Sequence, residues 1–249
     1  MTGSEQIWTS GARRFTAING RETLPILVAT PSDRPKGTVL LVHGRNGAPD
    51  QAQITEIANA YLAHGWRVAA PELPNSMALP DSGPPEHLTF SGHTRAAAAA
   101  WAWVARQWPD DLRALSGHSI GAYAIAHLAA ASPETHHVLA VSPPLSGRVL
   151  RAAREAMGPP AIEAVKREAP RFFAEMEIAD AGAALTRIKA PLAVITGTED
   201  ELVPLKDARA YFNAAPEARF FGALPGQHHC PAGEACGQML AVALAALGA

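Results

Sequence analysis

The sequence has little cysteine, no long apolar run and no excess of charge of one sign. Two cysteines in 249 residues exclude a disulfide-stapled scaffold. No window approaches the roughly 18 apolar residues of a membrane-spanning helix, and the first fifteen residues carry no apolar segment typical of a signal peptide. The formal net charge is −2, without the basic patch that nucleic acid or an anionic membrane needs. We therefore expect a cytoplasmic protein that binds neither nucleic acid nor membranes.

The two cysteines, Cys230 and Cys236, lie close together near the C-terminus. A reducing compartment favours free thiols at both positions. A disulfide between them, which would pin the loop that contains His228 and His229, is the alternative. A metal site made of these cysteines and His228 is disfavoured, because the spacing matches no common zinc pattern.

Short apolar segments alternate with longer alanine-rich segments along most of the chain. Strands are predicted at residues 38–42, 66–70, 112–116, 138–142, 191–196 and 218–224, and helices at 50–64, 94–108, 120–131 and 234–247. Residues 13–18 and 21–30 form a predicted hairpin that turns at Asn19-Gly20. This alternation predicts a single α/β domain over residues 1–249, with a mostly parallel sheet covered by helices on both faces and the hairpin at its edge.

Two segments interrupt the alternation. Residues 71–92 are too rich in proline for regular structure. Residues 147–180 have a helical pattern but are longer than a plain crossover needs, which is typical of a lid or binding insertion. The mixed charges of this insertion predict a solvated helical face, and Phe172, Phe173 and Met176 are expected either to roof an apolar pocket or to pack onto the rest of the protein.

The segment Gly117-His118-Ser119-Ile120-Gly121 joins a predicted strand to a predicted helix. A turn this abrupt forces a strained backbone at the serine and leaves no room for side chains two residues before and after it. The strain lifts the hydroxyl above the end of the strand and directs the N-terminus of the helix at the same point. Ser119 is therefore the candidate nucleophile, and the backbone N–H of Ile120 is a candidate donor to an oxyanion.

With this turn in place, the chain resembles the α/β-hydrolase fold family from about Phe15 to the last helix. The resemblance implies an acid after a later strand and a histidine after the last one. The loop Gly197-Thr198-Glu199-Asp200-Glu201-Leu202-Val203-Pro204 is similar to the family's acid loop and assigns Asp200, with Glu199 and Glu201 as solvated neighbours. The family spacing Gly-x-x-His selects His229 as the base, with the adjacent His228 as the alternative.

The segment His43-Gly44-Arg45-Asn46-Gly47 resembles the family's loop after the third strand. It implies that the backbone N–H of Arg45 is the second oxyanion donor and that His43 shapes the loop. Two interpretations of the Arg45 side chain stay open. It either forms a salt bridge with a nearby acid such as Glu72 or Asp50, or reaches the pocket rim and binds a substrate carboxylate.

These residues predict a serine hydrolase that cleaves a carboxylic ester of a small or medium-sized molecule, most similar to the dienelactone-hydrolase-like and small carboxylesterase branches. A serine nucleophile needs a base, and the base needs an anion to fix its tautomer. Thioesters or lactones are alternative substrates of the same residues, and a catalytically silent ligand-binding protein is a less favoured alternative. No cofactor or metal is expected, and a homodimer is possible.

Overall fold

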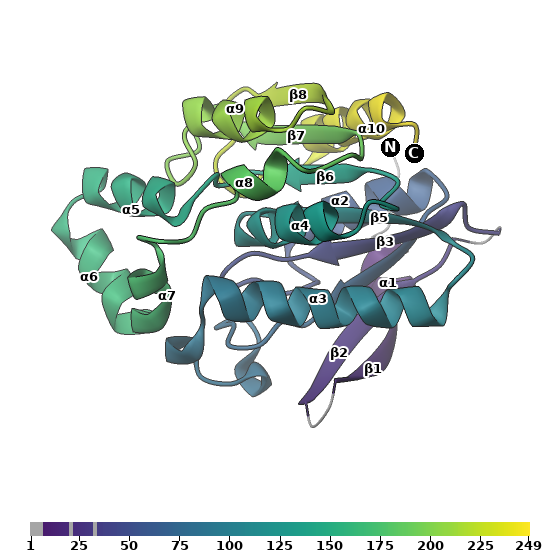
Figure 1. Ribbon diagram of the computed structural model, residues 1–249, viewed down its shortest axis with the longest axis horizontal. Coiled ribbons are helices and arrows are strands. Elements are labelled where there is room, and N and C mark those ends of the chain that lie inside the picture. The colour runs from purple at the N-terminus through teal and green to yellow at the C-terminus, as the bar shows by residue number, and fades with distance from the viewer. Residues whose placement is uncertain (1–6, 20–21, 32–33) are drawn as a thin grey trace.

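An eight-stranded sheet runs through the computed structural model, which describes residues 7–19, 22–31 and 34–249 (Figure 1). Its strands are β1 (Arg13–Asn19), β2 (Glu22–Ala29), β3 (Gly37–Val42), β4 (Arg67–Pro71), β5 (Leu112–His118), β6 (Val138–Val141), β7 (Leu192–Gly197) and β8 (Ala218–Leu224), in the order β1-β2-β4-β3-β5-β6-β7-β8. Strand β2 is antiparallel to both of its neighbours, and all other pairs are parallel. The predicted edge hairpin is confirmed, although Gly20 of its turn lies outside the described residues.

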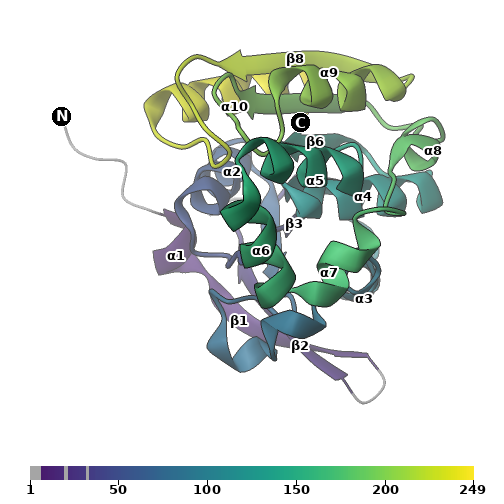
Figure 2. The same ribbon diagram turned by 90° about the vertical axis from the view of Figure 1, so that its left-hand side faces the viewer.

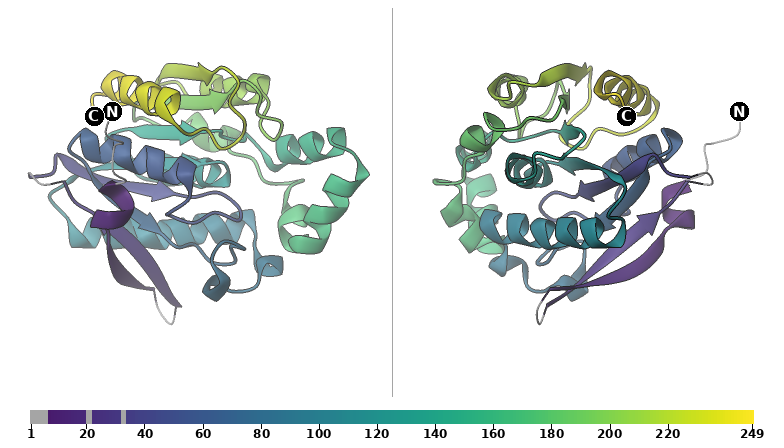
Figure 3. Two further views of the ribbon diagram at one scale, coloured as in Figure 1. Left: turned by 180° about the vertical axis from the view of Figure 1, so that it is seen from behind. Right: turned by 45° about the vertical axis from the view of Figure 1, so that its right-hand side comes forward.

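Both faces of the sheet are covered, as the apolar strands predict. In β3, Val39 and Leu41 contribute to one buried cluster, whereas Leu40 and Val42 contribute to the cluster on the opposite face. The first face packs against α1 (Ile7–Gly11), α2 (Ala52–Ala63) and α10 (Glu234–Leu247). The second face packs against α3 (Phe90–Gln107), α4 (Ile120–Ala131), α8 (Gly182–Leu185) and α9 (Leu205–Ala214) (Figures 1 and 3).

Several helices depart from the sequence prediction. Helix α3 begins at Phe90, four residues before the predicted start, because the Thr89 hydroxyl accepts a hydrogen bond of 2.8 Å from the N–H of Gly92 and caps the first turn. Helices α1, α8 and α9 were not predicted. The proline-rich segment before α3 contains two short 3₁₀ turns, η1 (Pro80–Ser82) and η2 (Pro85–His87), and is otherwise irregular, as expected.

Residues 147–180 form a helical insertion that projects beyond the sheet (Figures 1 and 2). It contains α5 (Gly147–Ala156), α6 (Pro159–Glu168) and α7 (Pro170–Glu175). Its two ends are held together at the neck, where Ser146 and Asp180 form a β-bridge and the N–H of Gly147 donates to the carbonyl of Ala179 at 2.9 Å. These contacts join the first and last residues of the insertion.

The insertion is packed against the rest of the protein through aromatic and polar contacts. The rings of Phe172 and Phe90 stack with centroids 4.3 Å apart. Glu175 accepts hydrogen bonds from the backbone N–H and the hydroxyl of Ser91, at 3.0 and 2.6 Å. Met176 is fully buried. Phe172 also lines the cavity described below, so both expected roles of these apolar residues occur.

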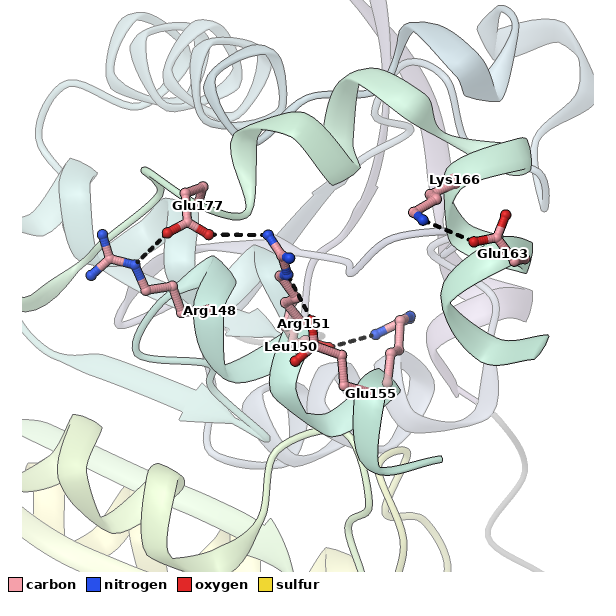
Figure 4. A network of polar contacts seen from close by, with 8 residues as sticks. Arg148, Leu150, Arg151, Glu155, Glu163, Lys166 and Glu177 are labelled. Carbon is pink, nitrogen blue, oxygen red and sulfur yellow. Dashed lines mark hydrogen bonds and ion pairs between the residues drawn. The ribbon is translucent and has the colours of Figure 1, made fainter. Parts of the chain in front are cut away.

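Most charged side chains of the insertion lie on its outer surface, as predicted. Arg148 and Arg151 both form ion pairs with Glu177, and Arg151 also contacts Glu155 (Figure 4). Arg154, on the same helix, is an exception, because the residue is only 9% exposed. The prediction of a solvated face is therefore wrong for Arg154.

The connections of the sheet create a crevice at the carboxyl ends of β3 and β5. After β3 the chain goes to β4 on one side, and it then crosses over to β5 on the other side of β3. Helix α2 follows β3 on one face, and α4 follows β5 on the opposite face. Loops that leave neighbouring parallel strands in opposite directions open a space between them, which is where α/β sheets bind ligands.

No helix within the described ranges is both long and apolar enough to cross a bilayer.

Candidate active site

Ser119 lies at the junction of β5 and α4 in a strained backbone conformation. Its φ of 55° and ψ of −126° fall in a region that side-chain-bearing residues avoid. A Cβ atom on Gly117 would lie 2.6 Å from the carbonyl carbon of Gly121, and one on Gly121 would lie 2.1 Å from the carbonyl oxygen of Val42. The strained serine and the requirement for both glycines, predicted from the motif, are therefore confirmed.

Three side chains from three loops form a continuous hydrogen-bonded chain. His229 Nε2 is 2.9 Å from Ser119 Oγ, and His229 Nδ1 is 3.0 and 2.9 Å from the two carboxylate oxygens of Asp200. A carboxylate only accepts hydrogen bonds, so the ring proton is assigned to Nδ1. This tautomer leaves Nε2 free to accept the hydroxyl proton of Ser119.

Asp200 is held as a carboxylate. Its burial alone would raise its pKa, but hydrogen bonds from His229 and from the N–H groups of Val203 and Leu202 favour the ionised form. The net result is a pKa below the ordinary aspartate value. The anion needed beside Nδ1 is therefore present at neutral pH.

The alternative acid and base residues point elsewhere. His228 is 70% exposed at its side chain, and its Nδ1 donates to the carbonyl of Glu199 at 3.0 Å. Glu199 and Glu201 are both exposed. The structure thus brings Asp200 and His229 to Ser119. It does not bring His228, Glu199 or Glu201 there.

The loop after β3 passes beside Ser119 and is shaped by His43. His43 is buried, its Nδ1 donates to the Gly44 carbonyl at 2.8 Å, and its Nε2 accepts from the N–H of Leu73 at 3.0 Å. Within the described residues, the N–H groups of Arg45 and Ile120 donate to no other group. Two unpaired donors thus border the cavity that contains the Ser119 hydroxyl.

His118 is part of the site although no role was predicted for it. Its buried ring lies 5.0 Å from the ring of His229, and its Nε2 donates to the His229 carbonyl at 2.8 Å. Burial and the neighbouring His229 lower the pKa of His118 to about 3. Its position directly before Ser119 was the sequence signal that could have indicated a place in the site. Only the fold shows that its ring contacts the loop that carries His229.

A cavity of about 310 Å³ opens in front of Ser119. Its apolar walls include Ile120, Leu150, Phe172 and Leu202. Arg45 and Asn46 of the β3 loop and Arg154 of α5 in the insertion are among its polar lining residues. The body and the insertion thus both contribute to the space in which a substrate would bind.

The salt-bridge partner expected for Arg45 was wrong. The Arg45 guanidinium is 3.2 Å from Glu168 in the insertion, and Glu72 pairs instead with Arg14. Asp50 forms no ion pair among the described residues. The sequence could not identify Glu168, because it is 123 residues away and the insertion must fold back to bring it close.

The structure also shows how the two cysteines and the other potential metal-ligating side chains are arranged. Cys230 is exposed, Cys236 is buried, and they are not bonded to each other, in agreement with the predicted free thiols. Within the described part of the chain, no three histidine, cysteine, aspartate or glutamate side chains are arranged to hold a metal ion.

Similarity to known proteins is found in structure rather than in sequence. No protein-family model matches the chain, and no curated protein matches it. The ferulic-acid complex of Est1E from Butyrivibrio proteoclasticus gives a TM-score of 0.79 at 14% identity, over 94% of this chain and 98% of the other. The esterase domain of a Rhodothermus marinus protein gives 0.69 at 20% identity over 93% and 95%. A structure described as an alpha-beta serine hydrolase homologue, from Coxiella burnetii, gives 0.65 at 17% identity over 95% and 96%.

At these identities the similarity establishes the fold. The chain has the α/β-hydrolase fold, as the sequence motifs predicted.

Replacing Gly121 by alanine should destabilise the protein by an amount at the upper end of about 1–3 kcal/mol. The reason is that the new methyl group meets two backbone carbonyls, which cannot rotate away. Gly237→Ala is the matched control. A Cβ there lies 3.6 Å from Glu56 Oε2 within α10, so alanine should stabilise by up to about 1 kcal/mol through helix propensity. Urea unfolding measures both, and equal effects would contradict the close approach.

Stability should fall as the pH is lowered from about 6.5 to about 4. Burial lowers the pKa of His43 to about 4 and that of His93 to about 3, whereas an unfolded histidine titrates near 6.5. The unfolded chain therefore binds more protons across this window, and the free energy of unfolding rises with pH. His93→Gln should reduce the slope by up to about 1.36 kcal/mol per pH unit. The exposed His87→Gln should keep the wild-type slope, and an unchanged slope in His93→Gln would refute the assignment.

Proposed function

We propose that the protein is a serine hydrolase that cleaves a carboxylic ester of a small or medium-sized molecule through an acyl-enzyme. The observation that carries the proposal is the hydrogen-bonded chain from Ser119 Oγ through His229 to Asp200. Neutral serine is a weak nucleophile, and this arrangement is the common way in which proteins activate it. The esterase descriptions of the structural neighbours favour the same chemistry.

In the proposed reaction, Ser119 Oγ attacks the ester carbonyl while His229 Nε2 takes its proton. Asp200 stabilises the resulting imidazolium through the hydrogen bond at Nδ1. The tetrahedral intermediate collapses, the C–O bond breaks, and the leaving alcohol takes the proton from Nε2. Water then attacks the acyl-enzyme with His229 again as the base, which releases the acid and restores the serine.

The backbone N–H groups of Ile120 and Arg45 are the proposed donors to the negative oxygen of the intermediate. Both border the cavity, and within the described residues both lack another acceptor. Ile120 is the first residue of α4, so the partial positive charge of the helix N-terminus acts at the same place. Donors fixed in position before the reaction cost no reorganisation when the charge develops.

The cavity volume supports a small or medium-sized substrate. About 310 Å³ lies at the lower end of the range for ligand pockets, roughly 300–1,000 Å³. Cleavage of a thioester or a lactone would use the same nucleophile and the same oxyanion donors. A panel of esters, thioesters and lactones therefore has to show which bond the protein cleaves fastest. The presence of nucleophile, base, acid and donors together argues against a catalytically silent binding protein.

The proposed function is tested with variants of Ser119 and of the adjacent histidines His228 and His229. Wild type should hydrolyse p-nitrophenyl esters and be labelled by a fluorophosphonate at Ser119. Ser119→Ala and His229→Ala should lower kcat/KM by about 10⁴-fold or more, since a base or nucleophile acts with its partners as one unit. The exposed His228→Ala is the matched control and should stay within about threefold of wild type.

Three results distinguish the alternatives. Faster turnover of thioesters or lactones than of esters would change the leaving group but retain Ser119. A wild-type protein that is neither labelled nor active on the whole panel would be a binding protein. Hydrolysis that persists at the wild-type rate in Ser119→Ala would refute the mechanism.

A further inference from the structure

Among the described residues, two arginines line the cavity in front of Ser119, and no aspartate or glutamate lines it. They are Arg45, in the loop after β3, and Arg154, on α5 of the insertion. Glu168 contacts Arg45 at 3.2 Å but does not line the cavity. Arg45 is therefore paired with a carboxylate, whereas Arg154 has no ion-pair partner among the described residues.

Arg154 carries the charge without a counter-ion. The residue is 9% exposed, and within the described residues it forms no ion pair. Its protein hydrogen bond, from Nη1 to the Leu150 carbonyl of its own helix, is long at 3.4 Å. Burial, which has the largest effect, and repulsion from Arg45 together lower the pKa of Arg154 to about 10, and Glu168 partly opposes them. An arginine with this pKa is still charged at neutral pH.

The other arginines of α5 show that partners were available on this helix. Arg148 and Arg151 point outward and share Glu177 (Figure 4). Arg154 instead lines the cavity. A buried charge without a partner destabilises a protein, so such a group is retained where a bound ligand supplies the opposite charge.

We propose that the cavity binds esters that carry a carboxylate, which the Arg154 guanidinium holds while the ester carbonyl lies at Ser119. This inference rests on the proposed esterase function and specifies its substrate class. A guanidinium matches a carboxylate with two parallel hydrogen bonds. One uncompensated positive charge suits a monoanion better than a phosphate dianion, since Arg45 is already paired with Glu168. The apolar walls at Leu150 and Phe172 face the hydrocarbon part of the ligand.

The test uses two pairs of esters that differ mainly in charge. p-Nitrophenyl hydrogen glutarate and p-nitrophenyl pentanoate place the carboxylate or a methyl group on the acyl side. 3-Carboxyphenyl pentanoate and 3-methylphenyl pentanoate do so on the alcohol side. For each pair, the ratio of kcat/KM for the anionic ester to that for the neutral ester isolates the contribution of the carboxylate.

In at least one pair, Arg154→Met should lower this ratio by about 10- to 100-fold, the usual range for a hydrogen bond to a charged group. Arg154→Lys should retain part of the preference. The control Arg148→Met, on the outer side of the same helix, should keep the wild-type ratio. Glu168→Gln should raise the ratio, because it leaves the Arg45 charge uncompensated.

Ester binding to Ser119→Ala, measured by calorimetry, separates this inference from the proposed function. Ser119→Ala should bind the anionic ester more tightly than its neutral partner, and Ser119→Ala/Arg154→Met should lose this difference in affinity. That result would support the carboxylate site even if the wild type hydrolysed nothing. The opposite result is Ser119-dependent turnover of neutral esters together with kcat/KM ratios that Arg154→Met leaves unchanged in both ester pairs. It would overturn the carboxylate site and leave the proposed esterase function intact. If Arg154→Met failed to fold, Arg154→Gln would take its place, and both ratios unchanged in that variant would overturn the carboxylate site.

Discussion

Helix α4 approaches strand β3 so closely that a glycine is required at the point of contact, and the candidate site depends on this approach. A Cβ on Gly121 would lie 2.1 Å from the Val42 carbonyl oxygen. With the helix this near the sheet, the chain has one residue in which to turn, and Ser119 takes the positive φ that the turn requires. Its N–H is fixed to the Val141 carbonyl at 2.9 Å. Packing between a helix and a sheet thus maintains a local strain at a serine that lines the cavity.

Buried imidazoles connect the loops around that hydroxyl. His93 donates to the His43 carbonyl at 2.9 Å, and His43 in turn accepts from Leu73, so the β3 loop is held from two sides. His118 links the end of β5 to the loop that carries His229. Burial keeps these three histidines neutral, with pKa values of about 3 to 4, so each presents one donor and one acceptor nitrogen. The result is a site whose geometry is set before any ligand arrives.

The sequence was informative wherever chemistry follows local backbone geometry. Ser119 could be identified because the glycines around it are a local steric requirement, and family-like loops placed Asp200 and His229 after the correct strands. Arg154 and Glu168 could not be assigned, because their roles depend on how α5 and α6 fold back over the crevice. In a helical pattern of mixed charges, a buried arginine looks the same as an exposed one. The start of α3 was missed for a simpler reason, since its threonine cap lies inside a proline-rich segment.

The turn at Ser119 and the loop after β3 are proposed to direct one hydroxyl and two backbone N–H groups at the same reacting carbonyl. A crystal structure of the fluorophosphonate adduct tests this proposal most directly, because the phosphonyl oxygen occupies the place of the developing negative charge. The account predicts phosphorus bonded to Ser119 Oγ and the phosphonyl oxygen within about 3 Å of the backbone nitrogens of Ile120 and Arg45. A phosphonyl oxygen turned towards solvent, or an adduct on another residue, would contradict it.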